Sequence, residues 1–169
     1  MSEAMKGLKI GPCHDANNDF GPVITRQHQQ KVFGYIDSAE AQGAEIVVDG
    51  RNPTVVGHEN GFYVGGTLID KVTSQMDSYD AEIFGPVLVM MPYDSIEEAI
   101  SVTNDTPYGL AGYVQGNNMD AVMNVASQIR AGNININGGS GDLHTPFGGY
   151  KQSGNGREWG AHGFTDYLE

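Results

Sequence analysis

Hydrophobic and polar positions along the chain follow helical spacing in several segments and strand-like spacing between them. After a polar stretch, Thr25 is of the residue type that caps helix N-termini. Val32, Ile36 and Ala39 then recur at helical spacing, and Gly43 follows the last of them. A glycine at that place ends a helix in the left-handed conformation. The pattern therefore predicts one helix between the threonine and the glycine.

Two further helices are predicted by the same kinds of signal. Ser95 and Glu98 have the spacing of a capping box, and apolar residues then follow one helical face as far as Asn104. Asn118 predicts another N-cap before a periodic apolar run, which we expect to continue to a stop at Gly132.

Short β-rich runs separate the predicted helices. They comprise residues 44–48, 62–72, 86–92, 110–114 and 133–137. The run PVLVMMP at 86–92 is apolar almost throughout, which predicts a strand buried on both faces. Helices that alternate with strands predict an α/β fold with a mainly parallel sheet and flanking helices, and we expect residues 1–169 to form a single domain. Residues 138–160 predict a glycine-rich loop, and residues 164–169 a short extended segment.

Composition removes several classes of function. Nine Lys and Arg against 21 Asp and Glu give a formal net charge of −12, which repels phosphate backbones and anionic leaflets. We therefore expect neither nucleic acid nor a membrane as a partner. No stretch approaches the ~20 apolar residues of a membrane span, and the N-terminus lacks the apolar run of a signal peptide.

Cysteine and histidine supply no convincing catalytic or metal site. The one cysteine, Cys13, excludes an intrachain disulfide and is compatible with a reducing cytoplasm, where we expect the protein to reside. It lies in a turn-like GPCHD stretch, which predicts an exposed, incidental thiol. The five histidines are scattered without the spacing of a metal site, so we expect no metal. The segment GNGREWG at 154–160 lacks the preceding strand of a dinucleotide fingerprint.

Glu82 and Phe84 are a more specific pair. They stand two apart before the apolar run, so an extended segment would place both side chains on one side. A carboxylate accepts hydrogen bonds from vicinal hydroxyls, and an aromatic ring packs on a flat ring. The pair would suit a ribose that carries a heterocycle, although a glutamate before a strand is more often a solvated edge residue.

Several blocks together resemble the aldehyde dehydrogenase superfamily, and specifically its C-terminal catalytic-domain portion. They occur in family order over most of the chain: FGPVI at 20–24, EIFGPV at 82–87, NDTPYGL at 104–110, GNININ at 132–137, PFGGYKQSG at 146–154 and GRE at 156–158.

The resemblance implies an enzyme that oxidises an aldehyde to a carboxylic acid with NAD or NADP. In that family a cysteine attacks the aldehyde, hydride leaves to the nicotinamide, and water activated by a glutamate releases the acid. By resemblance, Glu82 would hold the nicotinamide ribose, Phe84 would pack near the nicotinamide, and Phe147 would lie at the substrate tunnel. Gly148, Gly149, Lys151 and Ser153 match positions that we expect to be structural.

The departures from the family are as informative. The nucleophile's Gly-Gln-x-Cys setting is not in the sequence, Cys13 does not occupy it, and the general-base glutamate and the cofactor domain are missing too. We therefore assign no catalytic residue, and we expect the chain to be inactive alone, with weak or no NAD or NADP binding. Residues 138–141 (GGSG) occupy a stretch that often carries bulkier substrate-lining groups.

Three interpretations remain open. The chain is either such an enzyme fragment or a catalytically silent, free-standing family derivative that associates with itself or with a full-length enzyme. A nucleotide-binding module without catalysis is a third possibility, and it rests on Glu82 and Phe84 alone.

Overall fold

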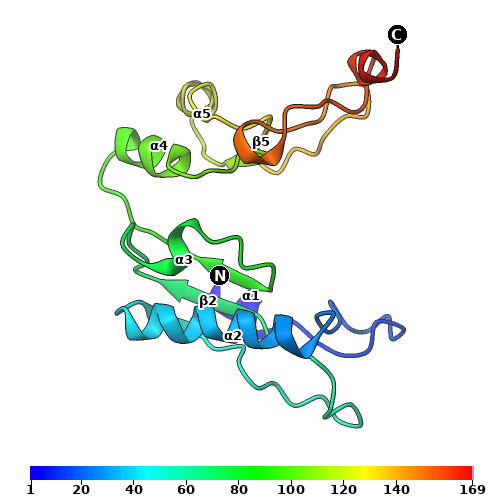
Figure 1. The fold of residues 1–169 in the computed structure, drawn as a ribbon. Helices are drawn as coiled ribbons and strands as arrows, with labels where there is room; N and C mark the ends of the chain where they lie inside the picture. The colour runs from blue at the N-terminus through cyan, green and yellow to red at the C-terminus, as the bar shows by residue number, and fades with distance from the viewer. Residues whose placement is uncertain (169) are drawn as a thin grey trace. The chain divides into compact units, whose positions relative to one another are not determined.

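The computed structural model describes residues 1–168, which form two compact units divided at Pro92–Tyr93 (Figure 1). The expectation of one domain over residues 1–169 stays a prediction, because two compact units can belong to one domain. In the described residues no helix is both long and apolar enough to cross a membrane.

The long helix of the first unit is α2, Arg26–Ala41, and its two ends confirm the local prediction. The side-chain oxygen of Thr25 accepts a hydrogen bond from the backbone N–H of His28 at 3.1 Å. Gly43 has φ +99°, and the following residue donates to the carbonyl of Ala39 at 2.9 Å. This bond closes a Schellman-type end, in which a left-handed glycine lets the chain turn back and satisfy the helix carbonyls.

The sheet of the first unit has the strand order β1-β2-β3, with bounds Glu45–Val48, Thr67–Asp70 and Val87–Val89. β1 and β2 are antiparallel, and β2 and β3 are parallel. A mainly parallel sheet is therefore not confirmed here. The loop between β1 and β2 contains no helix, so the chain returns antiparallel, whereas the short helix α3 (Asp77–Asp80) lies in the crossover from β2 to β3.

The core of this unit lies between α2 and the sheet. Val32 and Ile36 of α2 and Ile69 of β2 are fully buried, as the helical spacing predicted for the first two. The prediction that residues 86–92 form a strand buried on both faces is wrong, because Leu88 is 39% exposed. Its neighbours in β3, Val87 and Val89, are half-buried, so the face of β3 that carries Leu88 is the one open to solvent. A short helix, α1 (Ser2–Lys6), lies at the N-terminus.

The second unit contains α4 (Ile96–Asn104), β4 (Ala111–Val114), α5 (Met119–Ala126) and β5 (Asn133–Ile136). β4 and β5 form a parallel pair. Both predicted N-caps are confirmed, because the side chains of Ser95 and Asn118 accept hydrogen bonds from the backbones of Glu98 and Ala121 at 3.1 Å each.

The predicted continuation of α5 to Gly132 is wrong, because the helix ends at Ala126. The segment that follows it is bound to Asn104 instead. The Asn104 amide donates to the carbonyl of Gln128 at 2.9 Å and accepts from the backbone of Arg130 at 2.7 Å. These long-range bonds take the place of a further helical turn.

The C-terminal part forms two 3-10 helices, η1 (Lys151–Ser153) and η2 (His162–Tyr167). The extended segment predicted from residue 164 is therefore wrong as far as Tyr167, and Glu169 lies outside the described residues. Phe147 and Glu158 form an isolated antiparallel bridge across the glycine-rich loop.

Candidate functional site

The turn that carries Phe84 departs from the extended conformation assumed in the sequence argument. Phe84 has φ +56°, in the left-handed region that side chains other than glycine rarely adopt. The alternation that would place Glu82 and Phe84 on one side of a strand therefore does not apply. The backbone turns at Phe84, and the residue as a whole is 66% exposed.

Contacts on both sides hold this turn in place. The Phe84 carbonyl oxygen lies 2.6 Å from Nε2 of His28. Because a carbonyl only accepts, Nε2 carries the hydrogen. Ile83 is buried, and a Cβ built on Gly85 would lie 2.9 Å from the methyl carbons of Val32. These contacts hold the backbone of the turn against α2, while the Phe84 side chain stays exposed to solvent. A strained residue with an exposed aromatic side chain is typical of a ligand-binding position.

A hollow of about 400 Å³ opens beside the Phe84 ring, lined also by Thr25, Gln27, His28 and Lys31. Sequence reasoning found Phe84 but missed His28 and Lys31. Their spacing of three places both on one face of α2. It did not show which face meets Phe84. The hollow offers an exposed ring, a cation and hydrogen-bonding groups, and these fit the ring and ribose of a nicotinamide nucleotide.

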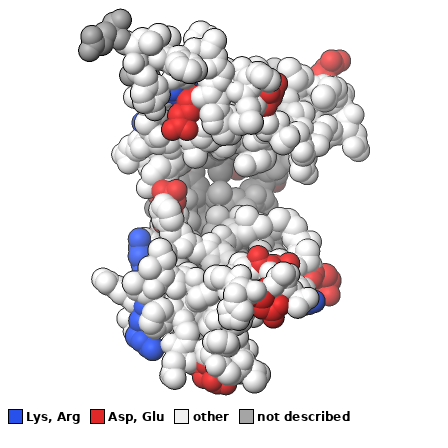
Figure 2. Space-filling view, turned by 90° about the vertical axis from the view of Figure 1, so that its right-hand side faces the viewer, with Lys and Arg blue, Asp and Glu red and all other residues white. Residues whose placement is uncertain are grey.

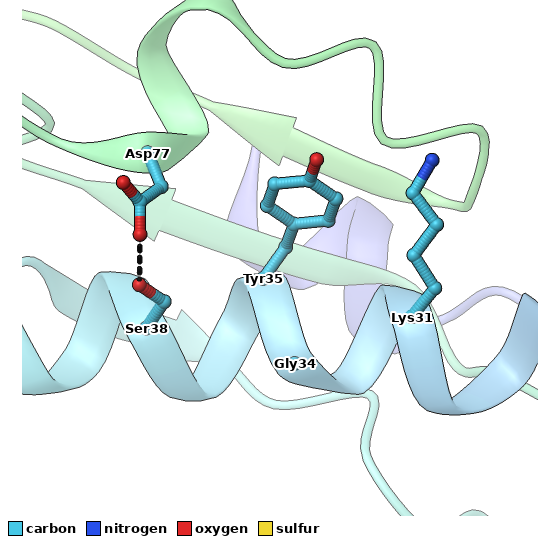
Figure 3. A pocket seen from close by; sticks show the side chains of 5 residues that line it. All are labelled: Lys31, Gly34, Tyr35, Ser38 and Asp77. Atoms are coloured by element: carbon cyan, nitrogen blue, oxygen red, sulfur yellow. Dashed lines mark hydrogen bonds between the residues drawn. The ribbon is translucent and has the colours of Figure 1, made fainter.

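The same face of α2 continues past Lys31 to Tyr35 and Ser38 (Figure 3). The Lys31 ammonium lies 5.8 Å from the centre of the Tyr35 ring, a cation–π contact. Ser38 donates to a carboxylate oxygen of Asp77 at 2.6 Å, as the dashed line in Figure 3 shows. Asp77 thus joins the start of α3 to α2.

Glu82 is exposed, two residues before Phe84. Its carboxylate is accessible from solvent, as a ligand for ribose hydroxyls must be. Its role stays a prediction.

Phe147 belongs to the second unit and is half-buried. Its backbone exchanges two hydrogen bonds with Glu158, at 2.8 and 2.7 Å. Its ring stacks on that of Trp159, with centroids 4.8 Å apart and an angle of 30° between the planes. The structure therefore pairs the predicted substrate residue with an aromatic partner that sequence reasoning did not single out.

The four positions expected to be structural hold the second unit together. Lys151 donates to the carbonyls of Asn104 and Thr106 at 2.8 and 2.9 Å. The Ser153 hydroxyl accepts from the backbone of Gly109 at 3.0 Å. Gly149, which is buried, accepts a hydrogen bond at its carbonyl from Arg157 at 2.8 Å. A Cβ on Gly148 would collide with the carbonyl of Gly156. These contacts support the structural interpretation.

Cys13 is free and exposed, in agreement with the sequence prediction. Among the side chains that the structure describes, those of residues 1–165, 167 and 168, no group of three or more His, Cys, Asp or Glu is placed to hold a metal ion.

Charges concentrate at one cluster in the first unit. The Arg51 guanidinium contacts Asp37, Glu40 and Asp49. Its side-chain hydrogen bonds hold the pKa of Asp49 below the usual value and raise the pKa of Arg51 itself. Figure 2 shows Asp and Glu in several separate groups on the face that it draws, and Lys or Arg atoms lie directly beside some of them.

Comparison with known proteins gives the family. The model of the aldehyde dehydrogenase family matches residues 1–169. The chain is 41% identical over 164 residues to a 3-succinoylsemialdehyde-pyridine dehydrogenase of a Pseudomonas species. It is 46% identical to the methylmalonate-semialdehyde dehydrogenase of Oceanimonas doudoroffii, with a TM-score of 0.93 over 100% of this chain. A mutant aldehyde dehydrogenase of Pseudomonas syringae, solved with NAD+ and octanal, is 41% identical, with a TM-score of 0.92 over 99% of this chain.

The match covers a part of each relative. The chain spans 34% of the Pseudomonas relative, 36% of the Oceanimonas structure and 34% of the Pseudomonas syringae structure, about a third in each case.

Proposed function

Because this chain belongs to the aldehyde dehydrogenase family, we propose that it is the C-terminal catalytic-domain portion of an enzyme that oxidises an aldehyde to a carboxylic acid with NAD or NADP. The observation that carries the proposal is the exposed Phe84, held in a strained backbone conformation beside Lys31 and His28. A free ring and a cation in one hollow fit the nicotinamide end of the cofactor. When bound, that cofactor supplies the hydride acceptor.

The residues of this chain bind and orient rather than react. Phe84 packs against a flat ring, and Lys31 donates to ribose or phosphate oxygens. Glu82 accepts from ribose hydroxyls through its exposed carboxylate. His28 keeps the turn in place because its Nε2–H donates a hydrogen bond to the Phe84 carbonyl. Phe147 forms part of the wall along which the aldehyde approaches.

The chain alone is inactive under this proposal. Its sequence lacks the Gly-Gln-x-Cys setting of the nucleophile, and its one cysteine is exposed in a loop. Affinity for NAD or NADP is weak, because the contacts to adenine and to most of the phosphates lie outside these residues. The free, exposed thiol suits a reducing cytoplasm as the place of the protein.

Titration of the isotope-labelled chain with nicotinamide mononucleotide, followed by NMR, tests the site. We expect binding in the millimolar range that weakens several-fold in Phe84→Ala and Lys31→Met, and is unchanged in the matched control Lys9→Met. Equal binding by Phe84→Ala and the unchanged chain would overturn the site. NAD reduction that depends on an aldehyde would overturn the inactivity, and micromolar NAD binding would overturn the weak affinity.

The length of the native protein is a separate question. An immunoblot of the source cells, with an antibody raised against this chain, answers it. A band roughly three times larger than 18.1 kDa, in keeping with the 34% share of the relative, supports the enzyme portion. A band near 18.1 kDa supports the alternative function.

The alternative is a catalytically silent derivative that associates with itself or with a full-length enzyme. It is favoured by large apolar side chains that stay exposed in the second unit, among them Tyr113 at 74% and Phe164 at 70%. Exposed apolar groups of this size favour association. Native mass spectrometry tests it: stable oligomers, or co-purification with a full-length relative, support the alternative, and a monodisperse monomer at high concentration contradicts it.

The aldehyde is not selected by the comparisons. The relatives are named for a pyridine-bearing succinoylsemialdehyde and for methylmalonate semialdehyde, and one structure contains octanal. A choice of substrate class has to come from the residues of this chain.

A further inference from the structure

Trp159 has a backbone conformation that bulky residues seldom adopt. Its φ is +64°, in the left-handed region, where the Cβ of an L-residue crowds the following carbonyl. Backbone hydrogen bonds on each side hold it there. Glu158 is bridged to Phe147, and the N–H of Gly160 donates to the carbonyl of Leu143 at 3.1 Å.

The strained conformation has a consequence for the side chain. Along an extended strand, successive side chains point to opposite faces, so Trp159 would point away from the face that Glu158 shares with its bridge partner Phe147. The left-handed turn breaks the alternation and brings the indole onto the Phe147 ring at 4.8 Å. Strain at a side chain that makes a specific contact is typical of functional positions.

The indole is also open to a ligand. Trp159 is 41% exposed although one ring face is stacked on Phe147. It borders the glycine-rich segment 138–141, because a Cβ built on Gly141 would lie 3.6 Å from Cζ3 of Trp159. A side chain at Gly141 would thus contact the edge of the indole at Cζ3, and glycine leaves that position open.

We propose that Trp159 is a specificity-determining residue that selects aldehydes carrying a flat aromatic ring, which stacks beside the indole in the space left by Gly141. The inference rests on the proposed function and names its substrate class. Aromatic rings prefer offset-stacked or edge-to-face contact with one another, and an aliphatic ring of equal size lacks that gain.

The chain contains one tryptophan, so one indole N–H resonance reports on this place alone. The labelled chain is titrated with benzaldehyde and, separately, with cyclohexanecarbaldehyde, which has the same number of carbon atoms. We expect a saturable ring-current shift of the indole resonance with benzaldehyde, and affinity about threefold to tenfold above that of the aliphatic aldehyde. Equal affinities, or an indole resonance that does not respond, would overturn the proposal.

Variants separate this role from a structural one. Gly141→Leu fills the space beside the indole, and we expect it to abolish the benzaldehyde shift while the indole resonance stays dispersed. Gly34→Leu is the matched control, because a Cβ there meets nothing within 4 Å, and it should bind benzaldehyde unchanged. If Gly141→Leu does not fold, saturation-transfer NMR on Trp159→Leu takes its place, and undiminished benzaldehyde selectivity in that variant overturns the proposal.

The titration contains no nicotinamide nucleotide. Aromatic selectivity without any effect of Phe84→Ala on nucleotide binding would uphold the role of Trp159 and overturn the cofactor part of the proposed function. Weaker nucleotide binding by Phe84→Ala together with equal affinities for the two aldehydes would overturn the role of Trp159 alone.

Discussion

The ammonium of Lys151 lies 2.8 Å from the carbonyl oxygen of Asn104, a residue 47 positions earlier in the chain. The same ammonium reaches the carbonyl of Thr106 at 2.9 Å. Asn104 is the last residue of α4, and the final carbonyls of a helix have no partner within the helix. One charged side chain of the glycine-rich C-terminal segment thus caps a helix and holds the loop that leads to β4.

Loss of this charge should loosen the second unit. Lys151→Met leaves two carbonyls without their charged donor, and we expect the free energy of unfolding to fall by about 1–3 kcal/mol. Urea denaturation followed by the fluorescence of Trp159, which lies in the same unit, measures it. Lys6→Met is the control, because Lys6 is an exposed side chain paired with Glu3 at 3.4 Å. Equal losses in the two variants would contradict the capping role.

Two substitutions at Phe84 should have different effects on stability but the same effect on nucleotide binding. Phe84→Gly relieves the left-handed backbone at little cost in packing, since the side chain is 66% exposed. We expect it to be more stable than Phe84→Ala by about 1–2 kcal/mol. Both variants should lose affinity for nicotinamide mononucleotide. Denaturant titration and NMR measure the two effects, and a Phe84→Gly chain less stable than Phe84→Ala would refute the strain.

Two glycines should respond in opposite directions to alanine. A Cβ on Gly132 would collide with the backbone carbonyl of Gly148, which cannot move as a flexible side chain does. We expect Gly132→Ala to cost at least about 2 kcal/mol. Gly34 lies inside α2 with open space around it, so Gly34→Ala should stabilise the chain by roughly 0.5–1 kcal/mol. Paired denaturation curves test this, and the same sign in both variants would contradict it.

The Arg51 cluster predicts a specific response to acid. The folded pKa of Asp49 is lowered, chiefly by its hydrogen bonds with Arg51. Its contribution to stability is therefore complete above the unfolded pKa of roughly 4 and is lost as the pH falls through the folded pKa. Because the Asp49 side chain is 45% exposed, screening limits this contribution to under about 1 kcal/mol.

Asp49→Asn should accordingly flatten the fall in stability below pH about 4. Arg51→Met should produce the same flattening. The double variant, with Asp49→Asn and Arg51→Met together, should flatten the pH dependence no further than either single variant. Urea denaturation over a series of acidic pH values measures this. An unchanged pH dependence in Arg51→Met would show that the pair does not act in this way.

Local features of the fold were predictable because their causes lie within a few residues. The caps at Thr25, Ser95 and Asn118 are confirmed, since each side-chain oxygen accepts a hydrogen bond from the backbone N–H three positions on. The burial of Val32 and Ile36 is confirmed as well, because the helical spacing of apolar residues along a short stretch already places them on one face.

Features that depend on distant partners were missed. α5 ends early because Asn104 binds the segment after it, and the first sheet is mixed because no helix lies between β1 and β2. The candidate site shows the same limit. Phe84 stood out by its type and spacing, whereas Lys31, more than 50 positions away, joins it only through the fold.

By itself the sequence determined the helix caps, the α/β order of elements, the family resemblance and the lack of the nucleophile's setting. The tertiary structure decided the strained turns at Phe84 and Trp159, the pairing of Phe147 with the indole, and the use of Lys151 as a helix cap. The physical reason is the range of the interactions. A cap or an amphipathic face is set by neighbours along the chain. A bulky residue with a left-handed backbone, or an ammonium group that donates to a distant carbonyl, is stable only when contacts remote in sequence outweigh its local cost.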